Sequence, residues 1–506
     1  MINYVIEDYL KLLEDAGLTV SFRLFGREKT PVTGLTYESG KSASGTLFVC
    51  KGALFKEAYL REAVDRGAVL YISETDYGLE DVPCILVKNV REAMPLLARM
   101  YYQIPKGALS CIGITGTKGK TTTAYYVKAI FDEHAKHTGG RPMACFTSVE
   151  LYDGKERSPS RITTPESLEL YRHFRNAYDS GISHVAMEVS SQALKYGRVQ
   201  GISFDAGVFL NISEDHISPV EHKDFQDYFH SKLLLFRQVK TACVNLDSPF
   251  SRTILRHAAA AERIVTFGTA PGADICGYDL KTDQGKVEFR VKCPAFDGAF
   301  SLAMHGIFNV ENALAAIAVA YSFGIPVEDM QAGLSRATVN GRMEEFQSRD
   351  GKIRAIVDFA HNGLSFEKIF ETVKLEYPDF RVTAVFGCPG GKALNRRKDL
   401  GLVAGKYCSH VYLSTDDPGP ERVQDICREI GGYLKEAGCP YECIPDREEA
   451  VGKAVRDAEE KTVILVLGKG SETSQKVGHK DIACRSDSEI VRDCLRKYDE
   501  LSRQQF

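Results

Sequence analysis

The stretch Gly113-Ile-Thr-Gly-Thr-Lys-Gly-Lys-Thr-Thr-Thr123 decides how the surrounding chain folds. An apolar run from Ala108 to Ile114 leads into it, and a helical pattern begins near Ala124. A strand, a glycine-rich turn and a helix in this order cradle nucleotide phosphates, because glycine lets backbone N–H groups approach the phosphate oxygens and the helix N-terminus adds partial positive charge. The sequence therefore predicts ATP binding, with Lys120 on the terminal phosphates and Thr121 on a magnesium ion.

The spacing departs from the common phosphate-loop pattern GxxxxGK[ST], which would need glycine at position 114, where this chain has Ile. The nearest glycines are Gly113 and Gly116, so the remaining core is Gly-Thr-x-Gly-Lys-Thr-Thr. A lysine-rich surface turn is the alternative interpretation. The flanking strand and helix signals favour the phosphate loop.

The composition is that of an ordinary globular protein. The 506 residues are enough for about three domains, and 44% are hydrophobic and 26% charged. A net charge of −4 with dispersed Lys and Arg gives no reason to expect a nucleic-acid partner. No apolar run reaches the length of a membrane span, and residues 1–17 predict an amphipathic helix instead of a signal peptide. The fourteen cysteines lack metal-binding spacing, so we expect reduced thiols in a cytoplasmic protein without a membrane partner.

Strands that alternate with helices predict an α/β protein of three domains. We expect a small N-terminal α/β domain at 1–107, a central ATP-binding domain with a parallel sheet at 108–343, and a C-terminal Rossmann-like α/β domain at 344–506. In the central domain, 273–304 reads as antiparallel strands inserted before a helix at Asn309–Phe323. The other expected strands are Thr46–Cys50, Val69–Ile72, Cys84–Val87, His184–Val189, Ala206–Leu210, Thr241–Val244, Arg263–Thr266, Ile353–Phe359, Arg381–Gly387, His410–Ser414 and Thr462–Gly468.

Polar side chains follow several of these strands, and ligands bind at the carboxyl ends of parallel strands. They are Glu188, Asn211, His361, Asp416, Asp417, Lys469 and Glu472. Because such clusters follow successive strands of two sheets, the sequence predicts a site between two domains.

A series of motifs gives the chain a family resemblance. They are TGLTYES (33–39), GTKGKTT (116–122), TTPES (163–167), MEVSSQAL (187–194), FLNISEDHI (209–217), HKDFQDYFHSKLLLF (222–236), GIFNVENALAA (306–316), NGRMEEF (340–346), VDFAHNGLS (357–365) and GKGSE (468–472). With these motifs in this order, nearly the whole chain resembles the Mur ligases, specifically the MurE type that adds the third amino acid to the peptidoglycan stem peptide. The resemblance implies an ATP-dependent amide ligase whose three domains hold the UDP end of the substrate, ATP and the incoming amino acid. We expect the protein to be a monomer.

The reaction that the resemblance implies has two steps. A substrate carboxylate attacks the γ-phosphate of ATP to give an acyl phosphate, and the amine of the amino acid then displaces phosphate through a tetrahedral intermediate. Such chemistry depends on charge neutralisation and positioning. The ATP phosphates would lie on Gly116, Thr117, Lys118, Gly119, Lys120, Thr121 and Thr122.

The same resemblance implies a metal and nucleotide site. Thr121 and Glu188 would bind one magnesium ion and His216 a second, assisted by Lys232 as a carbamate, with Lys120, Glu188, His216 and Lys232 as the catalytic set. The alternatives are that Glu188 is an ordinary surface residue and Lys232 a solvated helical lysine. Asn309 and Asn312 resemble adenine contacts, against a helix cap and a surface amide as the alternative. Arg342, Asp358 and His361 resemble further ATP contacts at the junction to the third domain.

For the UDP-linked substrate, Thr163, Thr164, Ser190 and Arg198 resemble the residues that hold the sugar-peptide, and Ser39 lies where the first domain meets the diphosphate. Arg198 suits a phosphate or carboxylate because its guanidinium is planar. Two departures from the family, Gln192 for His and Asn340 for Pro, remove no charge that the chemistry needs.

The amino-acid substrate is predicted from Asp416-Asp-Pro-Gly419. Members that add meso-diaminopimelate carry Asp-Asn-Pro-Arg there, and the Arg grips the second carboxylate. Here that Arg is missing and Asp417 adds negative charge, which favours an ammonium over a carboxylate, so L-lysine is expected. Asp416, Asp417, Gly468 and Glu472 would bind the amino acid, with Arg397, or its neighbour Arg396, on the α-carboxylate.

Three alternatives remain open. The residues after Pro418 differ from the usual lysine type, so Arg422 could restore diaminopimelate binding, and ornithine or another diamino acid is also compatible. A folate-glutamate ligase shares the phosphate loop, although MEVSSQAL favours the muramyl substrate. A catalytically silent binding paralogue is opposed by the intact Lys120, Glu188, His216 and Lys232.

Overall fold

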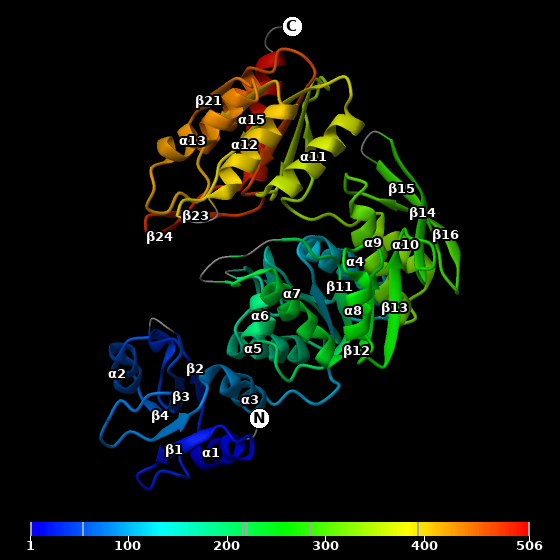
Figure 1. The fold of residues 1–506 in the computed structure, drawn as a ribbon. Coiled ribbons are helices and arrows are strands. Elements are labelled where there is room, and N and C mark those ends of the chain that lie inside the picture. Colours follow the sequence, from blue (N-terminus) through cyan, green and yellow to red (C-terminus); the bar gives the residue numbers. More distant parts are fainter. Residues whose placement is uncertain are drawn as a thin grey trace. The chain divides into compact units, whose positions relative to one another are not determined.

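The computed structural model describes residues 3–52, 55–160, 162–214, 217, 221–283, 286–391 and 394–503. The chain divides into two compact units, Met1–Ile275 with Ala315–Asp329, and Cys276–Leu314 with Met330–Phe506. Sheets recur at the N-terminal, central and C-terminal parts of the chain, as the sequence predicted (Figure 1). Among the described residues, no helix combines the length and the apolar character that crossing a membrane requires.

The N-terminal sheet of the first unit has the order β1-β5-β4-β3-β2. Only β1 runs antiparallel, against β5. Its strands are β1 Thr19–Arg23, β2 Gly34–Thr36, β3 Thr46–Val49, β4 Ala68–Ser73 and β5 Cys84–Val87, and its helices are α1 Ile6–Asp15, α2 Glu57–Asp65 and α3 Val90–Tyr102. The three strands expected here are confirmed to within one residue at each end.

The central sheet of the first unit has six parallel strands in the order β13-β12-β11-β6-β10-β7. The strands are β6 Ser110–Thr115, β7 Ala144–Phe146, β10 His184–Glu188, β11 Phe204–Phe209, β12 Val239–Asn245 and β13 Arg263–Gly268, with antiparallel β8 Glu150–Tyr152 and β9 Arg157–Pro159 at the β7 edge. The helices are α4 Lys120–Thr138, α5 Ser167–Asp179, α6 Ser191–Lys195, α7 Phe225–Leu233 and α8 Ser251–Ala258. The strands β7 and β10, which follow β6 in the chain, lie on one side of it, and β11 to β13 lie on the other side, which makes the carboxyl end of β6 a topological switch point where ligands bind.

One boundary was predicted wrongly. Helix α4 begins at Lys120, four residues before the expected start near Ala124. The run of threonines has low helix propensity by itself, but Thr121, Thr122 and Thr123 are buried against the sheet. Tertiary burial therefore outweighs local preference at this helix start.

The second unit contains an antiparallel meander and a mixed sheet. The meander is β14 Ile275–Asp283, β15 Lys286–Lys292 and β16 Asp297–Leu302, which confirms the antiparallel strands expected at 273–304. The sheet has the order β17-β18-β22-β19-β20-β21, and only β17 is antiparallel. These strands are β17 Glu344–Gln347, β18 Ile353–Asp358, β19 Arg381–Phe386, β20 His410–Leu413, β21 Tyr441–Cys443 and β22 Thr462–Leu467.

Helices cover both faces of this C-terminal sheet (Figure 1). The side chains of α11 Gly363–Glu376, α12 Asn395–Tyr407 and α13 Val423–Glu436 form one core with the sheet, and those of α14 Arg447–Arg456 and α15 Asp487–Arg503 form another. Every residue of β22 is buried, as expected for a central parallel strand. The remaining elements are α9 Asn309–Ser322, α10 Val327–Leu334 and the two-stranded hairpin β23 Ser474–Val477 and β24 Lys480–Ala483.

Candidate active site

The phosphate loop joins the end of β6 to the start of α4. Gly116 and Gly119 have φ values of +156° and +86°, a region that L side chains rarely adopt. A Cβ placed on Gly116 would lie 2.9 Å from the Leu210 Cβ, so the loop passes too close to the end of β11 for a side chain. Asn211 anchors the turn through two hydrogen bonds. Its backbone oxygen accepts the Thr117 N–H at 3.0 Å, and its Oδ1 accepts the Lys118 N–H at 2.9 Å.

Lys120 is the first residue of α4 and curls back over this turn. Its Nζ donates to the carbonyl oxygens of Gly116 and Thr117 at 3.0 and 3.1 Å. The ammonium is therefore held beside a helix N-terminus, where an anion is stabilised. The residues predicted to bind ATP phosphates, 116 to 122, all lie in this one turn and the first residues of α4.

Thr121, the second residue of α4, lies beside Glu188, the last residue of β10. The Thr121 hydroxyl donates to Glu188 Oε1 at 2.7 Å, and Ser148 donates to the same oxygen from its backbone N–H at 2.8 Å. Glu188 is only 1% exposed, which excludes the alternative of an ordinary surface glutamate. A hydroxyl and a carboxylate are the hard oxygen ligands that Mg²⁺ prefers, so the pair fits a magnesium ion. His216, the other expected magnesium ligand, lies outside the described residues.

Lys232 lies at the end of α7 and is buried, so the alternative of a solvated helical lysine does not hold. Its Nζ donates to the Gly116 carbonyl oxygen at 2.9 Å and lies 4.7 Å from the centre of the Tyr228 ring. The Tyr228 hydroxyl in turn donates to Thr117 Oγ1 at 3.1 Å. Helix α7 therefore places Lys232 directly against the phosphate loop.

Thr164 and Ser190 lie beside the last residue of β10. Thr164 donates to the backbone oxygen of Glu188 at 2.9 Å and accepts the Ser190 N–H at 3.0 Å. Ser190 also caps α6 by accepting the Ala193 N–H. The structure thus brings these two predicted substrate residues together next to Glu188, the predicted magnesium ligand. Thr163, directly before Thr164, is half-buried.

Arg198 is paired with a carboxylate of the chain itself. Its Nε lies 2.9 Å from Glu166 Oε1, and the same oxygen lies 2.9 Å from the Nζ of Lys51. Lys51 and Glu166 were missed by sequence reasoning, although Glu166 stands inside the TTPES motif. Ser39 lies in the N-terminal part of the unit, where it donates to Glu62 Oε2 at 2.7 Å.

In the second unit, the pairing of β17 with β18 brings Arg342 and Asp358 together. The Asp358 carboxylate accepts the N–H groups of Met343 at 2.8 Å and Ala360 at 2.7 Å, and the Arg342 guanidinium lies 4.4 Å from the ring centre of Phe359. The His361 ring hydrogen-bonds the Phe359 backbone oxygen through Nδ1. These three predicted nucleotide contacts form one cluster.

Asn309 and Asn312 lie on the first turn of α9 and are both buried. Asn309 donates to the His305 backbone oxygen at 2.7 Å, and Asn312 donates to Asn309 Oδ1 at 3.0 Å. The two amides are therefore held in one orientation, and the alternative of a surface amide does not hold.

The predicted amino-acid residues gather at the carboxyl ends of β20 and β22, the two neighbours of β19. Asp416 and Asp417 follow β20, and Gly468 to Glu472 follow β22. Gly468 has φ +110°, and a Cβ there would lie 2.8 Å from Asp416 Oδ2, so the carboxylate rests against a position that only glycine suits. Burial raises the pKa of both Asp416 and Glu472, against the opposing effect of nearby Arg447 or Lys469.

Lys469 occupies the middle of these carboxylates and is 3% exposed. Its Nζ donates to Asp417 Oδ1 at 3.0 Å, to Glu472 Oε2 at 2.6 Å and to the Ser474 backbone oxygen at 2.7 Å. Burial lowers its pKa, but the three neighbouring carboxylates outweigh burial and raise it above the usual value. The sequence marked Lys469 as a residue at a strand end without predicting that it would fill the acidic cluster.

Arg447 and Asp487 form an ion pair next to this cluster. Their bidentate pair is buried, with Nε–Oδ1 at 2.6 Å and Nη2–Oδ2 at 2.7 Å. Arg447 also donates to the backbone oxygens of Thr415 at 3.0 Å and Leu467 at 2.9 Å, the residues directly before Asp416 and Gly468. One guanidinium therefore links the two strand ends that carry the site. No motif in the sequence signalled it.

Arg397, expected to hold an α-carboxylate, is buried in α12 and held by glutamates of the chain. It pairs with Glu421 at 2.8 Å and Glu429 at 2.6 Å. Its guanidinium is thus already neutralised in this structure, and its expected role stays a prediction.

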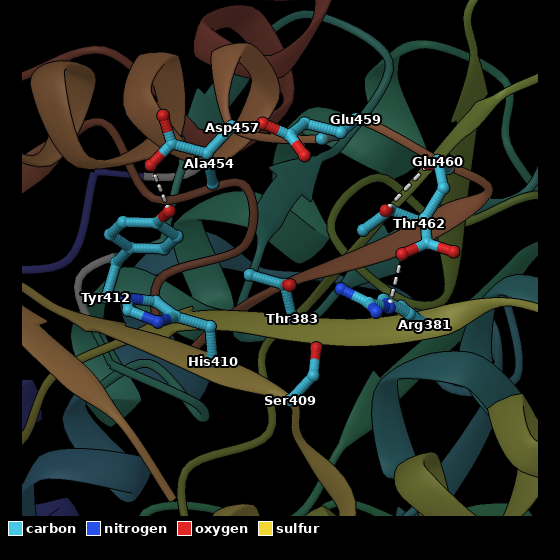
Figure 2. Close-up of a pocket in the computed structure, with 11 residues that line it drawn as sticks. Arg381, Thr383, Ser409, His410, Tyr412, Ala454, Asp457, Glu459, Glu460 and Thr462 are labelled. Carbon is cyan, nitrogen blue, oxygen red and sulfur yellow. Dashed lines mark hydrogen bonds and ion pairs between the residues drawn. The ribbon is translucent and has the colours of Figure 1, made fainter.

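A cavity of about 270 Å³ lies at the opposite, amino-terminal end of the C-terminal sheet (Figure 2). Arg381, His410 and Thr462, the first residues of β19, β20 and β22, line it. Tyr412 donates to Asp457 across one side at 2.6 Å, and Arg381 pairs with Glu460 on the other, as Figure 2 shows. This cavity is separate from the acidic cluster, because it lies at the other end of the same strands.

Two family models and several curated relatives match most of the chain. A family model described as the Mur ligase middle domain matches residues 114–320, and one described as the Mur ligase, glutamate ligase domain, matches 341–470. A UDP-N-acetylmuramoyl-L-alanyl-D-glutamate–L-lysine ligase of Enterococcus faecalis is 36% identical over 97% of each chain. A protein with the same name from Streptococcus mutans is 37% identical over 91% of this chain and 92% of its own.

Solved structures are similar in fold. A UDP-N-acetylmuramoyl-L-alanyl-D-glutamate–2,6-diaminopimelate ligase superimposes with a TM-score of 0.66 at 23% identity, covering 98% of this chain and 99% of that one. A MurF structure from Acinetobacter baumannii gives a TM-score of 0.67 at 18% identity, over 98% and 99% of the two chains. At these identities the likeness extends to the fold alone.

Proposed function

This chain belongs to the Mur ligase family of ATP-dependent ligases, and from that premise we propose that it adds L-lysine to UDP-N-acetylmuramoyl-L-alanyl-D-glutamate. At the coarser level it is a MurE-type ligase that joins a diamino acid to the UDP-linked dipeptide, in the synthesis of peptidoglycan precursors. We assign 1–107 to the UDP end of the substrate, 108–343 to ATP and 344–506 to the amino acid. We assign the enzyme to the cytoplasm, where nucleotide-linked precursors and ATP are supplied.

The first chemical step takes place at the phosphate loop. Lys120 and the N–H groups of 116–122 would bind the ATP phosphates, and Thr121 with Glu188 would hold a magnesium ion, which would supply positive charge to neutralise the phosphates. A carboxylate oxygen of the dipeptide then attacks the γ-phosphorus, and the bond from that phosphorus to ADP breaks. The product is an acyl phosphate of the dipeptide.

Thr164, Ser190 and Arg198 are proposed to hold the dipeptide beside this centre, and Ser39 the diphosphate. Thr164 and Ser190 support the proposal, because they lie next to the backbone of Glu188. Asn309, Asn312, Arg342, Asp358 and His361 are proposed to contact the nucleotide. In the second step the amine of the amino acid attacks the acyl carbon, the C–O bond to phosphate breaks and the amine loses a proton.

Lys232 is proposed to act as a carbamate and, with His216, to assist a second magnesium ion. The Lys232 ammonium first loses a proton. Addition of CO₂ to the resulting amine forms an N–C bond and releases a second proton, so that a cation becomes an anion. The nitrogen keeps one N–H, and that N–H can still donate to the Gly116 oxygen that Lys232 contacts at 2.9 Å.

The choice of lysine rests on one observation: carboxylates gather in the acidic cluster, and position 419 has no cationic side chain. Asp416, Asp417 and Glu472 gather at two strand ends, and Gly419 supplies no charge to bind a second carboxylate. Excess negative charge favours a side-chain ammonium over a carboxylate. meso-Diaminopimelate is the second candidate, because Arg422 is exposed close to this loop in the sequence and carries a positive charge.

The test is phosphate release with ATP, magnesium and UDP-N-acetylmuramoyl-L-Ala-D-Glu, comparing L-lysine, meso-diaminopimelate and L-ornithine at equal concentration. Turnover fastest with lysine, with a product mass increased by one lysine residue, supports the proposal. Faster turnover with diaminopimelate keeps the ligase and overturns the lysine preference. Inactivity with all three overturns the ligase proposal and favours a binding protein or a different acceptor.

A further inference from the structure

The hairpin β23–β24 has almost no core of its own. Its eight strand residues are exposed except for Gln475, which is half-buried. An isolated two-stranded hairpin is marginally stable in water, so its position depends on what it contacts. In Figure 1 the hairpin lies at one end of the C-terminal part of the chain.

The hairpin is tied to the loop Thr415–Gly419. Gly419 donates to the Lys476 backbone oxygen at 3.0 Å, and Gly478 donates back to the Gly419 oxygen at 2.6 Å. The Lys476 N–H donates to Asp417 Oδ1 at 3.1 Å. These bonds extend strand-like pairing from the hairpin to the loop that carries the predicted specificity residues.

Gln475 supplies the side-chain part of this attachment. Its Nε2 donates to the backbone oxygen of Asp416 at 2.6 Å and to Thr415 Oγ1 at 3.0 Å. Gln475 thus holds the backbone oxygen of Asp416, and Arg447 holds the backbone oxygen of Thr415. Together these hydrogen bonds fix the backbone from which the Asp416 carboxylate projects.

Lys469 fixes the other half of the cluster. Its three contacts join Asp417, Glu472 and the first residue of the hairpin. Asp417 Oδ1 therefore already accepts two hydrogen bonds from the chain, one from Lys469 and one from Lys476. With three carboxylates and one ammonium, the cluster keeps a net negative charge when all four groups are ionised.

We infer that Gln475 and Lys469 are positioning residues for amino-acid selection, which hold Asp417 as a structural carboxylate and leave Asp416 and Glu472 to receive the ammonium of a diamino acid. The inference rests on the proposed ligase function. In this proposal the hairpin holds the Asp416–Gly419 loop in its conformation through the hydrogen bonds described above.

The test is a comparison of steady-state constants for the full-length wild type, Gln475→Ala and a control, Lys480→Ala, on the exposed strand of the same hairpin. Loss of two hydrogen bonds in Gln475→Ala is expected to raise the KM for the preferred diamino acid about tenfold and to leave the KM for ATP unchanged. Lys480→Ala is expected to match the wild type in both constants. A residue that only stabilises the fold would change the melting temperature without separating the two KM values.

Lys469 is tested by Lys469→Met against Lys469→Arg. Arginine keeps the positive charge and is expected to retain most of the selectivity for the preferred diamino acid over its competitor, whereas methionine loses it. If Lys469→Met does not fold, Gln475→Ala decides. Wild-type values in both Gln475→Ala and Lys469→Met, with an active wild type, overturn the inference and leave the ligase function standing. A wild type without turnover on any diamino acid overturns the proposed function, and the inference with it.

Discussion

Glu188 ends β10 with a buried carboxylate that accepts hydrogen bonds from Thr121 and Ser148. At the scale of single residues, the polar groups of the central site form hydrogen bonds and ion pairs with other groups of the chain. Lys120 and Lys232 both donate to the Gly116 oxygen, and Arg198 pairs with Glu166. Each of these three cationic side chains thus has a carbonyl or carboxylate partner within the chain.

Lys232→Ala is expected to lower phosphate release about 100-fold, because the buried side chain that would carry the metal-assisting anion is lost. Added formate or acetate is expected to restore part of the rate, since a small carboxylate can enter the space and supply the anion. The measurement is phosphate release with and without the added acid. Lys223→Ala, just before α7, is the control. Full activity of Lys232→Ala without any addition would contradict the proposed role.

Asp416→Asn is expected to stabilise the fold at pH 8 while it slows turnover with the diamino acid. Burial raises the pKa of Asp416 in the folded state above 3.8, because the buried carboxylate is disfavoured when it is charged. The contribution of this group to the free energy of unfolding is therefore favourable below pH 3.8 and is lost as the pH rises through the raised pKa. Asparagine does not ionise and avoids this penalty. Urea midpoints at pH 8 and near pH 3.5 check the prediction, and the difference between variant and wild type should be confined to pH 8. Asp425→Asn, exposed on α13, should show no difference at either pH.

At the scale of elements, β22 and its surroundings organise the second unit. The strand lies between β18 and β19, and Arg447 on α14 joins its end to the end of β20. A second polar centre joins the residue before Gly306 to β17 and α11: His305 contacts Glu345 through Nε2 at 2.6 Å and Glu376 through Nδ1 at 3.0 Å. These contacts tie the segment that leads into α9 to the C-terminal sheet.

The His305 contacts predict a pH-dependent stability of the second unit. Burial disfavours the charged ring, but Glu345 and Glu376 outweigh it and raise the His305 pKa to about 9. The stabilisation is therefore fully present below pH 6.5 and is lost as pH rises through 9, a change of about 3 kcal/mol. Urea denaturation at pH 6 and pH 10 measures it. His305→Gln should remove this part of the pH dependence, whereas His479→Gln, on the hairpin turn, should keep it. Equal pH dependence in His305→Gln and the wild type would contradict the assignment.

At the scale of the whole molecule, ATP and magnesium are expected to stabilise the folded chain together. A ligand that binds only the folded state at 100 times its Kd adds about 2.7 kcal/mol. Thermal unfolding should therefore shift upward with ATP and magnesium. The shift should largely disappear when EDTA is added, because Thr121 and Glu188 then have no ion to hold. Lys120→Ala should show little shift, and Lys106→Ala, in the loop before β6, should behave as the wild type. A shift in Lys120→Ala equal to that of the wild type would contradict the nucleotide site.

The sequence by itself determined the phosphate loop, the parallel strands and the groups at their carboxyl ends. These features are local: a glycine turn, an apolar run of five or six residues and the polar residue that follows are all read within one short segment. The start of α4 was misjudged, because burial against the sheet decided it. Arg342 and Asp358, predicted from the family resemblance, were found together because the pairing of β17 with β18 fixes their separation. Thr164 and Ser190, predicted in the same way, were found together because a hydrogen bond joins the loop before α5 to the residues after β10.

Only the tertiary structure decided what these groups contact. The order that places β22 between β18 and β19 depends on pairing between segments about a hundred residues apart, and apolar strands of similar composition pair equally well in several orders. The partners of three buried cations also depend on the fold. Lys469 contacts the carboxylates of its cluster, Arg397 pairs with Glu421 and Glu429, and Arg447 donates to the ends of two strands. A charged side chain loses its hydration on burial, so its partner must come from whichever segment the fold brings within hydrogen-bond distance.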